Sequence, residues 1–565
     1  MKQKRLTFTA RSNRHDASIA AHTPVETEQP APACAPSDPT SAAFTPAPTL
    51  RLSWLNAERV LWIWAAIVAA CVVWQPFLLG FYLDDWDLWV NGSTKGSPFS
   101  LTRLLFMNFT NPVRPGCLPG RFLGSSLFGA HPLLWQGALL LVNCAVAVSI
   151  VAVARALTQA RTPAGRAITA AAGLCWLLLP WNAAARFWSA LLPNTSMIAA
   201  LGLLCVLLVR GWEKHRSRPI AAGALYLWIC LSYEAFYLQW VTLILIGVVL
   251  WKARRNGLRP VLVSGVALIA AQGLAGLWNL YTKQAGYWTA MSVLPDWVVI
   301  VRVNLLRLAP ATLQSAAEIS AEILFCGLIV IAMWLVAHIR SFGRASDRPA
   351  GATSALLAGV SILGGLLSVV MYSLAGRMVT ATGVDTRPTM VFNFWLLVAG
   401  SVLTTFTLER LSGAPRLVFA VALAGFGLCL AVGQVLRASD WVTAWSQQQR
   451  ILVEAPVSDL KRTEPNARII LVNPLGVNGA PVFAASWDIN SAIPWTYPFL
   501  QGRRIIVYNP SEGVMKWDGT HLSYVGQPPL DTGAALYLWR PADMSFWRPA
   551  GPFVINRNLT IEPAQ

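Results

Sequence analysis

The stretch that decides the fold is VLWIWAAIVAACVVWQPFLLGFYLDDWDLWV, residues 60–90. Its first twenty residues are almost all apolar, which is enough for a helix to cross a hydrocarbon core about 30 Å thick. Three carboxylates, Asp84, Asp85 and Asp87, follow directly behind the apolar run. The run predicts a transmembrane helix, and the acidic cluster at its exit is the first candidate for a functional site.

The composition of the whole chain agrees with a membrane protein. Of 565 residues, 55% are hydrophobic and only 12% are charged, and the mean hydropathy is +0.50. A soluble domain usually carries about 25% charged residues. The net charge of +18 comes mainly from short loops between apolar segments, where basic residues orient a chain in the bilayer. We therefore assign the charge to membrane topology and not to nucleic-acid binding.

Apolar runs bounded by charged residues predict about eleven transmembrane helices. The residues before the first run, 1–52, begin with a basic stretch and continue rich in Pro, Ala and Thr, which predicts a disordered tail. Residues 53–437 are predicted to form the transmembrane domain. The predicted spans lie near residues 59–80, 133–154, 167–185, 190–209, 219–232, 235–251, 260–281, 318–339, 352–375, 389–408 and 416–437.

The loops also predict an orientation. With the tail in the cytoplasm, every inside loop is basic, as the positive-inside rule requires. The long first loop, 81–132, and the polar region 438–565 then lie outside. That region contains the strand-like runs ARIILVNP and RRIIVYNP, which predict a small soluble α/β domain. The predicted fold is an all-α polytopic membrane protein with a C-terminal extramembrane α/β domain; in a bacterium this domain would be periplasmic.

Local pattern alone leaves the purpose of the acidic cluster open. Carboxylates beside Trp86 and Trp89 are also typical of a solvated helix end with interfacial aromatic anchors. Further along the first loop, the stretch SPFSLTRLLFMNF, residues 97–109, has apolar residues at near-helical spacing. It predicts an amphipathic helix that lies in the membrane interface, or else a loop packed on the outer surface.

The order of features in this loop resembles that of the GT-C glycosyltransferases, and more narrowly the protein O-mannosyltransferase-like and aminoarabinose-transferase-like members. An acidic pair follows the first transmembrane helix, an interfacial helix comes next, and Arg114-Pro115 and LFGAHP lead into the second span. The resemblance covers residues 58–410. The sequence departs from the family pattern at Trp135-Gln136, at Tyr233-Glu234 and in TRPTMVFNF, residues 386–394.

The resemblance implies a membrane glycosyltransferase that moves a sugar from a polyprenyl-phosphate donor to a glycan, lipid or protein acceptor at the outer face. It implies Asp84 as the catalytic base, with Asp85 as its partner or substitute, because the acceptor's proton must go to a carboxylate within reach. Guanidinium groups suit a phosphate. The expected substrate-binding residues are Arg114, Glu234, Arg377 and Arg387.

Several alternatives stay open at this point. The arginines are equally suited to lipid headgroups, and Glu234 to a solvated turn. No cofactor is implied, and use of a divalent metal is undecided. Cys117 is expected to be a free thiol in a turn near the site, since no other cysteine is expected outside. The rival functions are a lipid-linked glycan transporter or flippase, an O-antigen ligase or polymerase, and a non-catalytic assembly protein.

Overall fold

The structure is a computed structural model. It describes residues 57–109, 112–159, 162–216, 218–254, 257–284, 299, 301–304, 306, 332–333, 348–374, 380, 383–411, 413–454, 463, 467–472, 476–497, 504–508, 514–524, 529–532, 535–541 and 545–564. The chain divides into two units, Met1–Trp54 and Leu55–Gln565, and everything below concerns the second. The predicted tail 1–52, Arg377 and all of the predicted span 318–339 except residues 332–333 lie outside the described residues.

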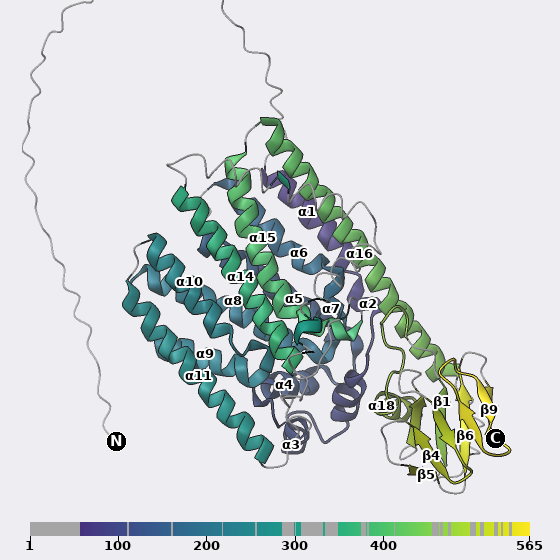
Figure 1. The fold of residues 1–565 in the computed structure, drawn as a ribbon. Helices are drawn as coiled ribbons and strands as arrows, with labels where there is room; N and C mark the ends of the chain where they lie inside the picture. The colour runs from purple at the N-terminus through teal and green to yellow at the C-terminus, as the bar shows by residue number, and fades with distance from the viewer. Residues whose placement is uncertain are drawn as a thin grey trace, which may run out of the picture. The chain divides into compact units, whose positions relative to one another are not determined.

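Apolar helices dominate the described part of the chain up to residue 454 (Figure 1). Within it, eight helices are long and apolar enough to cross a membrane, and a ninth span is formed if one bent pair is counted. The eight are α1 (Ala57–Val72) with α2 (Gln75–Leu78), α5 (Pro132–Thr158), α8 (Leu192–Glu213), α10 (Gln239–Arg254), α11 (Leu258–Gln284), α14 (Arg348–Leu374), α15 (Met390–Arg410) and α16 (Gly413–Glu454). This is the polytopic membrane protein that the sequence predicts.

Each predicted span within the described residues coincides with an apolar helix. Two of them are unusual. The span predicted at 167–185 is a pair of helical segments that bend by 61°. They are α6 (Pro163–Cys175) with η3 (Trp176–Leu178), then η4 (Pro180–Asn182) with α7 (Ala183–Phe187). The span predicted at 219–232 is α9 (Pro219–Ser232), an apolar helix of only 14 residues.

The first loop contains four short helical segments before α5 begins. They are η1 (Trp86–Asn91), a π-helical turn, then α3 (Leu101–Phe109), η2 (Pro115–Cys117) and α4 (Leu118–Phe128). α3 is the predicted amphipathic helix: Leu101 is 68% exposed, whereas Arg103 is buried. Arg103 donates to the carbonyl oxygens of Ser93, Gly96 and Ser125, so it fixes α3 to the rest of the loop.

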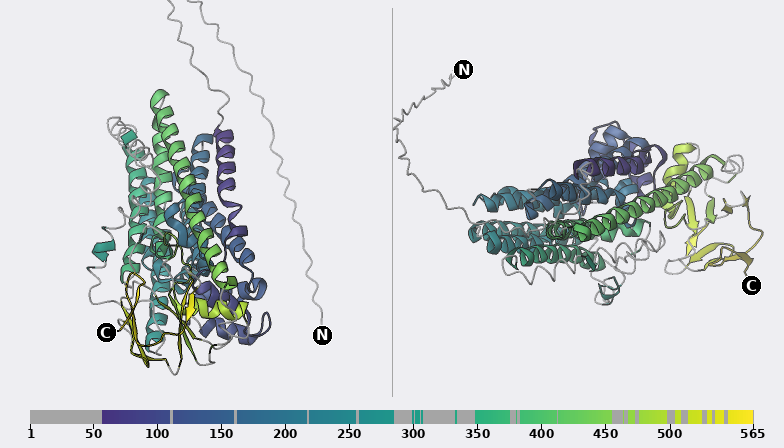
Figure 2. Two further views of the ribbon diagram at one scale, coloured as in Figure 1. Left: turned by 90° about the vertical axis from the view of Figure 1, so that its right-hand side faces the viewer. Right: turned by 90° about the horizontal axis from the view of Figure 1, so that it is seen from above.

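α16 continues past residue 437 without a break as far as Glu454 and leads into a strand-rich domain (Figures 1 and 2). In one sheet, β1 (Arg468–Val472) pairs in parallel with β2 (Arg504–Tyr508) and β6 (Leu536–Arg540), and β7 (Ser545–Trp547) is antiparallel to β6. The two predicted strand runs are β1 and β2, with Ile469 opposite Ile505. From Ile469 in β1 and from Ile505 in β2 onward, the side chains are buried because this sheet packs against α18 (Ser486–Thr496) and a second sheet.

The second sheet is antiparallel throughout, with the strand order β5-β4-β3-β8-β9. Its strands are short, and Met515, Leu522 and Ile555 are buried together with Ile470 and Leu538 of the first sheet. The C-terminal region is therefore a small domain with its own apolar core. Its strands are β3 (Met515–Trp517), β4 (His521–Tyr524), β5 (Leu530–Asp531), β8 (Phe553–Ile555) and β9 (Ile561–Pro563).

Candidate active site

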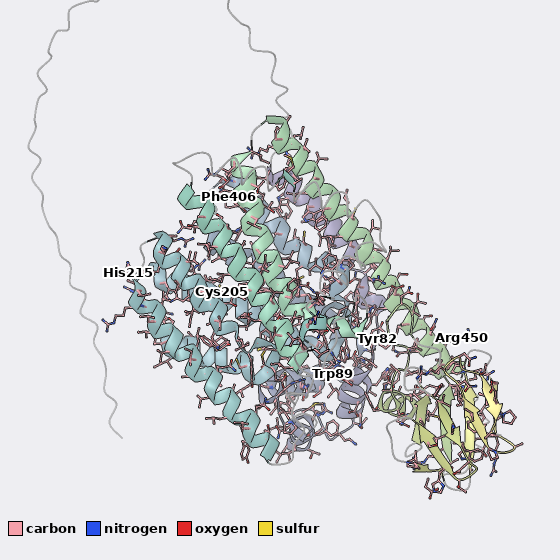
Figure 3. All side chains as sticks on the ribbon, in the orientation of Figure 1. Tyr82, Trp89, Cys205, His215, Phe406 and Arg450 are labelled. Atoms are coloured by element: carbon pink, nitrogen blue, oxygen red, sulfur yellow. The ribbon has the colours of Figure 1, made fainter. Side chains whose placement is uncertain are left out.

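The backbone turns sharply where the chain leaves α2. Leu83 has φ +48°, a conformation that is rare for a bulky residue and costs of order 1–3 kcal/mol. The turn places Asp84 and Asp85 on different sides of the chain, so that Asp85 is buried and Asp84 is partly exposed. Figure 3 marks Tyr82 and Trp89, the buried aromatic residues on either side of this acidic turn. The candidate site therefore includes a strained backbone residue, Leu83, directly before the two carboxylates.

Asp85 is fully buried and surrounded by backbone donors. Its carboxylate accepts hydrogen bonds from the N–H groups of Tyr82 (3.0 Å), Ser189 (3.3 Å) and Ala190 (2.6 Å). Burial raises the pKa of Asp85 to about 8, against the opposite effect of these hydrogen bonds. The contacts tie the exit of the first transmembrane helix to η5 (Ser189–Leu191), the turn that begins α8. Both oxygens of Asp85 are thus occupied by the protein itself.

Asp84 has a different environment. One of its oxygens, Oδ1, accepts a hydrogen bond from the indole Nε1–H of Trp487, at 3.1 Å. Burial raises the pKa of Asp84 above its usual range, while this hydrogen bond, Arg387 and Arg121 act to lower it. Within the described part of the chain, Asp84 Oδ2 accepts no hydrogen bond. Asp84 is therefore the carboxylate of the adjacent pair that a substrate could reach.

Arg114 and Glu234, both predicted to bind substrate, form an ion pair with each other. Arg114 Nη2 lies 2.9 Å from Glu234 Oε2, and its Nε lies 3.1 Å from both carboxylate oxygens. The guanidinium also sits 4.5 Å from the centre of the Tyr233 ring. Their side chains are only 17% and 10% exposed. Glu234 is therefore not a solvated turn residue; it fixes and compensates a buried arginine.

Gly116 explains why the Arg114 loop can approach α9 so closely. A Cβ at this position would lie 2.3 Å from Ser232 Oγ and 2.8 Å from the carbonyl oxygen of Trp228. The Trp228 indole donates to the Gly116 carbonyl at 2.9 Å. Because glycine has no side chain, the loop packs against the end of α9, and Arg114 meets Glu234 in η6 (Glu234–Phe236).

Arg387 belongs to the same group of charges. It lies in η7 (Val384–Thr389), at the start of α15, and its guanidinium is 5.4 Å from the centre of the Trp188 ring. It acts electrostatically on Asp84. Both Arg387 and Arg114 act electrostatically on the Tyr372 hydroxyl. The structure thus places Asp84, Arg387, Arg114 and Glu234 in one neighbourhood, whereas Arg377 is not described.

Arg121, in α4, was not predicted. It is only 7% exposed, its Nε has no hydrogen-bond partner among the described residues, and burial lowers its pKa. It acts electrostatically on Asp84 and Arg114. A buried cation without a paired carboxylate is costly to maintain, which makes it a candidate for binding an anion. The only sequence signal was a single basic residue in the otherwise uncharged stretch LPGRFLGSS.

Cys117 lies between these two arginines in the sequence. It is a free thiol, as predicted, but it is buried and not in an open turn. Its Sγ lies 3.1 Å from the Ser232 carbonyl oxygen and 3.3 Å from Asn194 Oδ1. Burial raises its pKa, so the thiol stays protonated and structural. Among the described residues, His, Cys, Asp and Glu form no cluster of three that could hold a metal.

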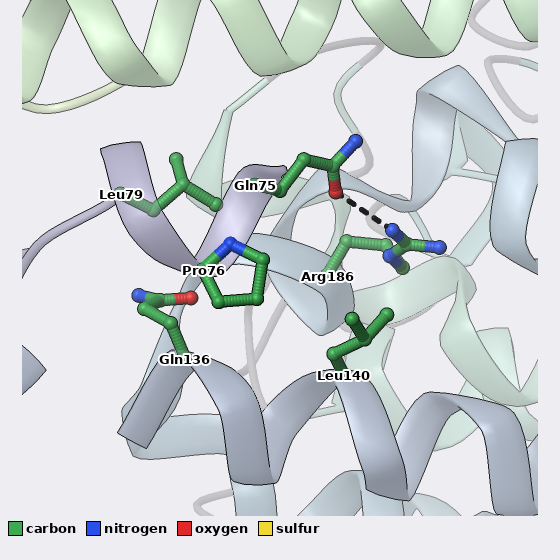
Figure 4. A pocket seen from close by; sticks show the side chains of 6 residues that line it. All are labelled: Gln75, Pro76, Leu79, Gln136, Leu140 and Arg186. Atoms are coloured by element: carbon green, nitrogen blue, oxygen red, sulfur yellow. Dashed lines mark hydrogen bonds between the residues drawn. The ribbon is translucent and has the colours of Figure 1, made fainter. Parts of the chain in front are cut away.

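The bent pair of helical segments supports the site, because α7 contacts η7, the segment that contains Arg387. The backbone N–H of Ala184 in α7 donates to Thr386 Oγ1, at 3.0 Å, so α7 holds η7 in place. Arg186, also in α7, donates to Gln75 Oε1 at 2.8 Å, in a polar cavity of about 10 Å³ (Figure 4). That volume suits about one water molecule, so this cavity does not accommodate a sugar or a lipid.

The family departures at positions 135 and 136 also have structural roles. Gln136 donates to the carbonyl oxygens of Gly80 (2.7 Å) and Phe187 (3.0 Å). The Trp135 ring stacks on Trp89, with their centroids 3.8 Å apart. These residues hold the strained exit of α2 against α5 and do not contact the charged group.

Fold and site together define a multi-pass membrane protein that carries, at the start of its first loop, a partly exposed carboxylate among several arginines. No protein-family model matches the sequence, and no curated protein matches it. Among solved structures, the chain is similar to ArnT from Cupriavidus metallidurans bound to undecaprenyl phosphate, with 12% identity and a TM-score of 0.42. That match covers 80% of this chain and 86% of ArnT. The apo state of the same protein gives 11% identity and a TM-score of 0.40, over the same shares of both chains.

Proposed function

We propose that this protein is a membrane glycosyltransferase that moves a sugar from a polyprenyl-phosphate donor to an acceptor at the outer face of the membrane. The observation that carries the proposal is the position of Asp84. It is partly exposed, it follows directly on the exit of the first transmembrane helix, and Arg387 and Arg121 act on it electrostatically. A lipid-held donor and an acceptor from the aqueous phase would meet at such a boundary.

Sugar transfer from a phosphate donor requires a base and a group that stabilises the leaving phosphate, and the site offers Asp84 and the arginines for these roles. Asp84 takes the proton of the acceptor hydroxyl or amine as the acceptor atom bonds to the anomeric carbon of the sugar. The bond from that carbon to the phosphate oxygen breaks at the same time, and the phosphate leaves with the electron pair. Arginine side chains stabilise the charge that develops on it. Burial that raises the pKa of Asp84 makes it a stronger base than an exposed carboxylate.

The remaining residues position these groups. Asp85 holds the acidic turn against η5 through the backbone N–H groups of Ser189 and Ala190. Glu234 orients the Arg114 guanidinium, which leaves part of its donor edge for the phosphate. Arg377, outside the described residues, remains a proposed phosphate contact from its predicted place in an outer loop. The sugar, the acceptor and any divalent ion are to be identified with the purified protein.

Arg121→Gln should weaken binding of undecaprenyl phosphate by about tenfold or more, since a hydrogen bond to a charged group contributes about 1.5–3 kcal/mol. The same change removes a buried charge that has no paired carboxylate in the described part of the chain, so the protein should be no less stable than the wild type. The measurement is binding of undecaprenyl phosphate to the protein in nanodiscs, together with its thermal unfolding. Arg416→Gln, an exposed arginine at the start of α16, is the control. Unchanged affinity in Arg121→Gln would remove Arg121 from the phosphate site.

We further propose that the chain crosses the bacterial plasma membrane with residues 1–52 in the cytoplasm and the C-terminal domain in the periplasm. The basic inside loops support this orientation. Alkaline phosphatase fused at Gln565 should be active and the same enzyme fused at Thr49 inactive, with the opposite result for a fluorescent protein. If both fusion points report the same compartment, the proposed topology is wrong, and so is an outer site for Asp84.

A lipid-linked glycan transporter is the second candidate, favoured by the bent pair of segments with the buried Arg186. Transporters often bind their substrate at broken helices. In this chain α7 contacts η7 through Ala184 and Thr386, so the bend also serves the proposed site. A transporter would bind the donor without breaking the bond between sugar and phosphate, and that difference separates the two candidates.

A further inference from the structure

A helix of the C-terminal domain packs on the acidic turn of the first loop. α18 lies against η1, and its Trp487 donates the hydrogen bond to Asp84 Oδ1 at 3.1 Å. The two residues are 403 positions apart in the chain. The Trp487 side chain is nevertheless 57% exposed, so this indole is directed toward Asp84 without being enclosed in the core of its own domain.

The start of α18 is fixed by Asp488, which is fully buried. Its carboxylate accepts from the backbone N–H groups of Ala484 (3.0 Å), Ala485 (3.3 Å) and Ile489 (2.8 Å). A carboxylate that binds N–H groups at a helix start stabilises the first turn. The backbone at Trp487 is therefore held rigidly, although its side chain is largely exposed.

Further contacts hold the two parts together. The Trp86 ring of η1 lies 5.7 Å from the Trp495 ring of α18. The Trp86 indole donates to Gln448 Oε1 at 3.0 Å, and the amide of Gln448 donates to the Pro481 carbonyl oxygen at 3.1 Å. The end of α16, the acidic turn and α18 thus form one continuous contact. Trp487 lies at the edge of this contact that faces Asp84.

We propose that Trp487 is a positioning residue for Asp84, and that the C-terminal domain thereby completes the candidate active site. The inference rests on the proposed function for its catalytic consequence, but the contact itself does not. An N–H donor on Oδ1 fixes the carboxylate in one rotamer and directs Oδ2 toward the acceptor. The C-terminal domain is then part of the catalytic unit and not an appended module.

The contact has a defined effect on proton affinity. A donor to the charged carboxylate favours that form, so its removal raises the pKa of Asp84. A base works only when it is ionised, and the acidic limb of the pH–rate profile would therefore move to higher pH. The other charged groups that act on Asp84 are unchanged by a substitution at Trp487; they are Arg121, Arg387, Asp85, Asp87 and Asp488.

The first test compares Trp487→Phe with the wild type over pH 5 to 9, with Trp495→Phe as the matched control on the same helix. A hydrogen bond to a charged group corresponds to a shift of about one to two pH units. In Trp487→Phe the acidic limb should move up by about that amount, with near-normal turnover above it. The limb of Trp495→Phe should stay in place. A uniform loss of turnover at all pH values would show a structural role only and would overturn the proposal.

A second measurement does not depend on activity. The protein is labelled with 5-fluorotryptophan in nanodiscs, and the ¹⁹F signal of Trp487 is assigned by its loss in Trp487→Phe or Trp487→Gln. This signal should shift with pH in the wild type and stay constant in Asp84→Asn. If the ¹⁹F signal of Trp487 does not change with pH, or shifts equally in Asp84→Asn, the contact between Trp487 and Asp84 is contradicted. A shifting signal in a protein without transferase activity supports the contact and contradicts the proposed function instead.

Discussion

Asp84→Asn is expected to abolish sugar transfer while the protein still folds and still binds its donor. Removal of a positioned general base typically costs about 10²–10⁴-fold in rate. In the wild type, the Trp487 indole donates a hydrogen bond to Asp84 Oδ1. Asparagine keeps the shape of the side chain, and its amide oxygen can still accept this hydrogen bond. The measurement is turnover of a lipid-linked sugar donor in nanodiscs, with donor affinity measured on the same preparation.

The neighbouring acids are the controls, and each has its own expected result. Asp87→Asn should reduce the transfer rate less than Asp84→Asn, because Asp87 Oδ1 already accepts a hydrogen bond from Asn91 Nδ2 of its own turn, at 3.0 Å. Asp85→Asn would direct an NH₂ group at backbone donors and should destabilise the fold by about 1–3 kcal/mol. If Asp84→Asn turns over normally while a folded Asp85→Asn is inactive, the base has been assigned to the wrong acid. Full activity in all three variants would leave the cluster as a solvated helix exit.

The environment of Asp84 also predicts how the rate of sugar transfer changes with pH. Since its pKa is raised above the usual range, transfer should fall as the pH drops through that raised value, earlier than for an exposed aspartate. This loss is absent from any residual activity of Asp84→Asn, which has no carboxylate to protonate.

The second large effect is expected at Arg114 and Glu234. Arg114→Leu leaves Glu234 as an uncompensated and largely buried carboxylate, and should lower the free energy of unfolding by about 3 kcal/mol. The double variant Arg114→Leu/Glu234→Leu removes both charges and should recover most of that stability. Thermal unfolding of both variants in one detergent measures the difference.

Donor binding separates structure from function at the same pair. If Arg114 contacts the phosphate, the double variant should stay deficient in binding undecaprenyl phosphate although its fold is restored. Arg254 and Glu213 form an ion pair elsewhere in the described part of the chain, and removing both should leave donor binding intact. Normal donor binding by Arg114→Leu/Glu234→Leu would show that the pair is purely structural.

Much of the fold follows from hydropathy. Each predicted span within the described residues is an apolar helix, and the runs around Ile469 and Ile505 are neighbouring strands. Such features depend on local composition, which a single sequence displays directly. Arg387, one of the residues expected to bind substrate, acts electrostatically on Asp84, and its role in binding stays a prediction.

The partners within the site could not be predicted, because they depend on contacts between distant segments. Arg114 and Glu234 are 120 positions apart, and no local pattern distinguishes an arginine that awaits a phosphate from one already paired. Asp84 and Asp85 are adjacent and look equivalent in sequence, but the turn at Leu83 buries only the second. Trp487 is one of 26 tryptophans, and only the packing of α18 on η1 distinguishes it.

The most direct test of the central claim is release of undecaprenyl phosphate from a labelled undecaprenyl-phosphate sugar by the purified protein in nanodiscs. A panel of such donors is incubated with candidate glycan, lipid and peptide acceptors. The account predicts acceptor-dependent release by the wild type, and no release by an Asp84→Asn variant that binds the same donor equally well. Binding without release in both proteins, or equal release by both, would contradict a glycosyltransferase in which Asp84 is the base.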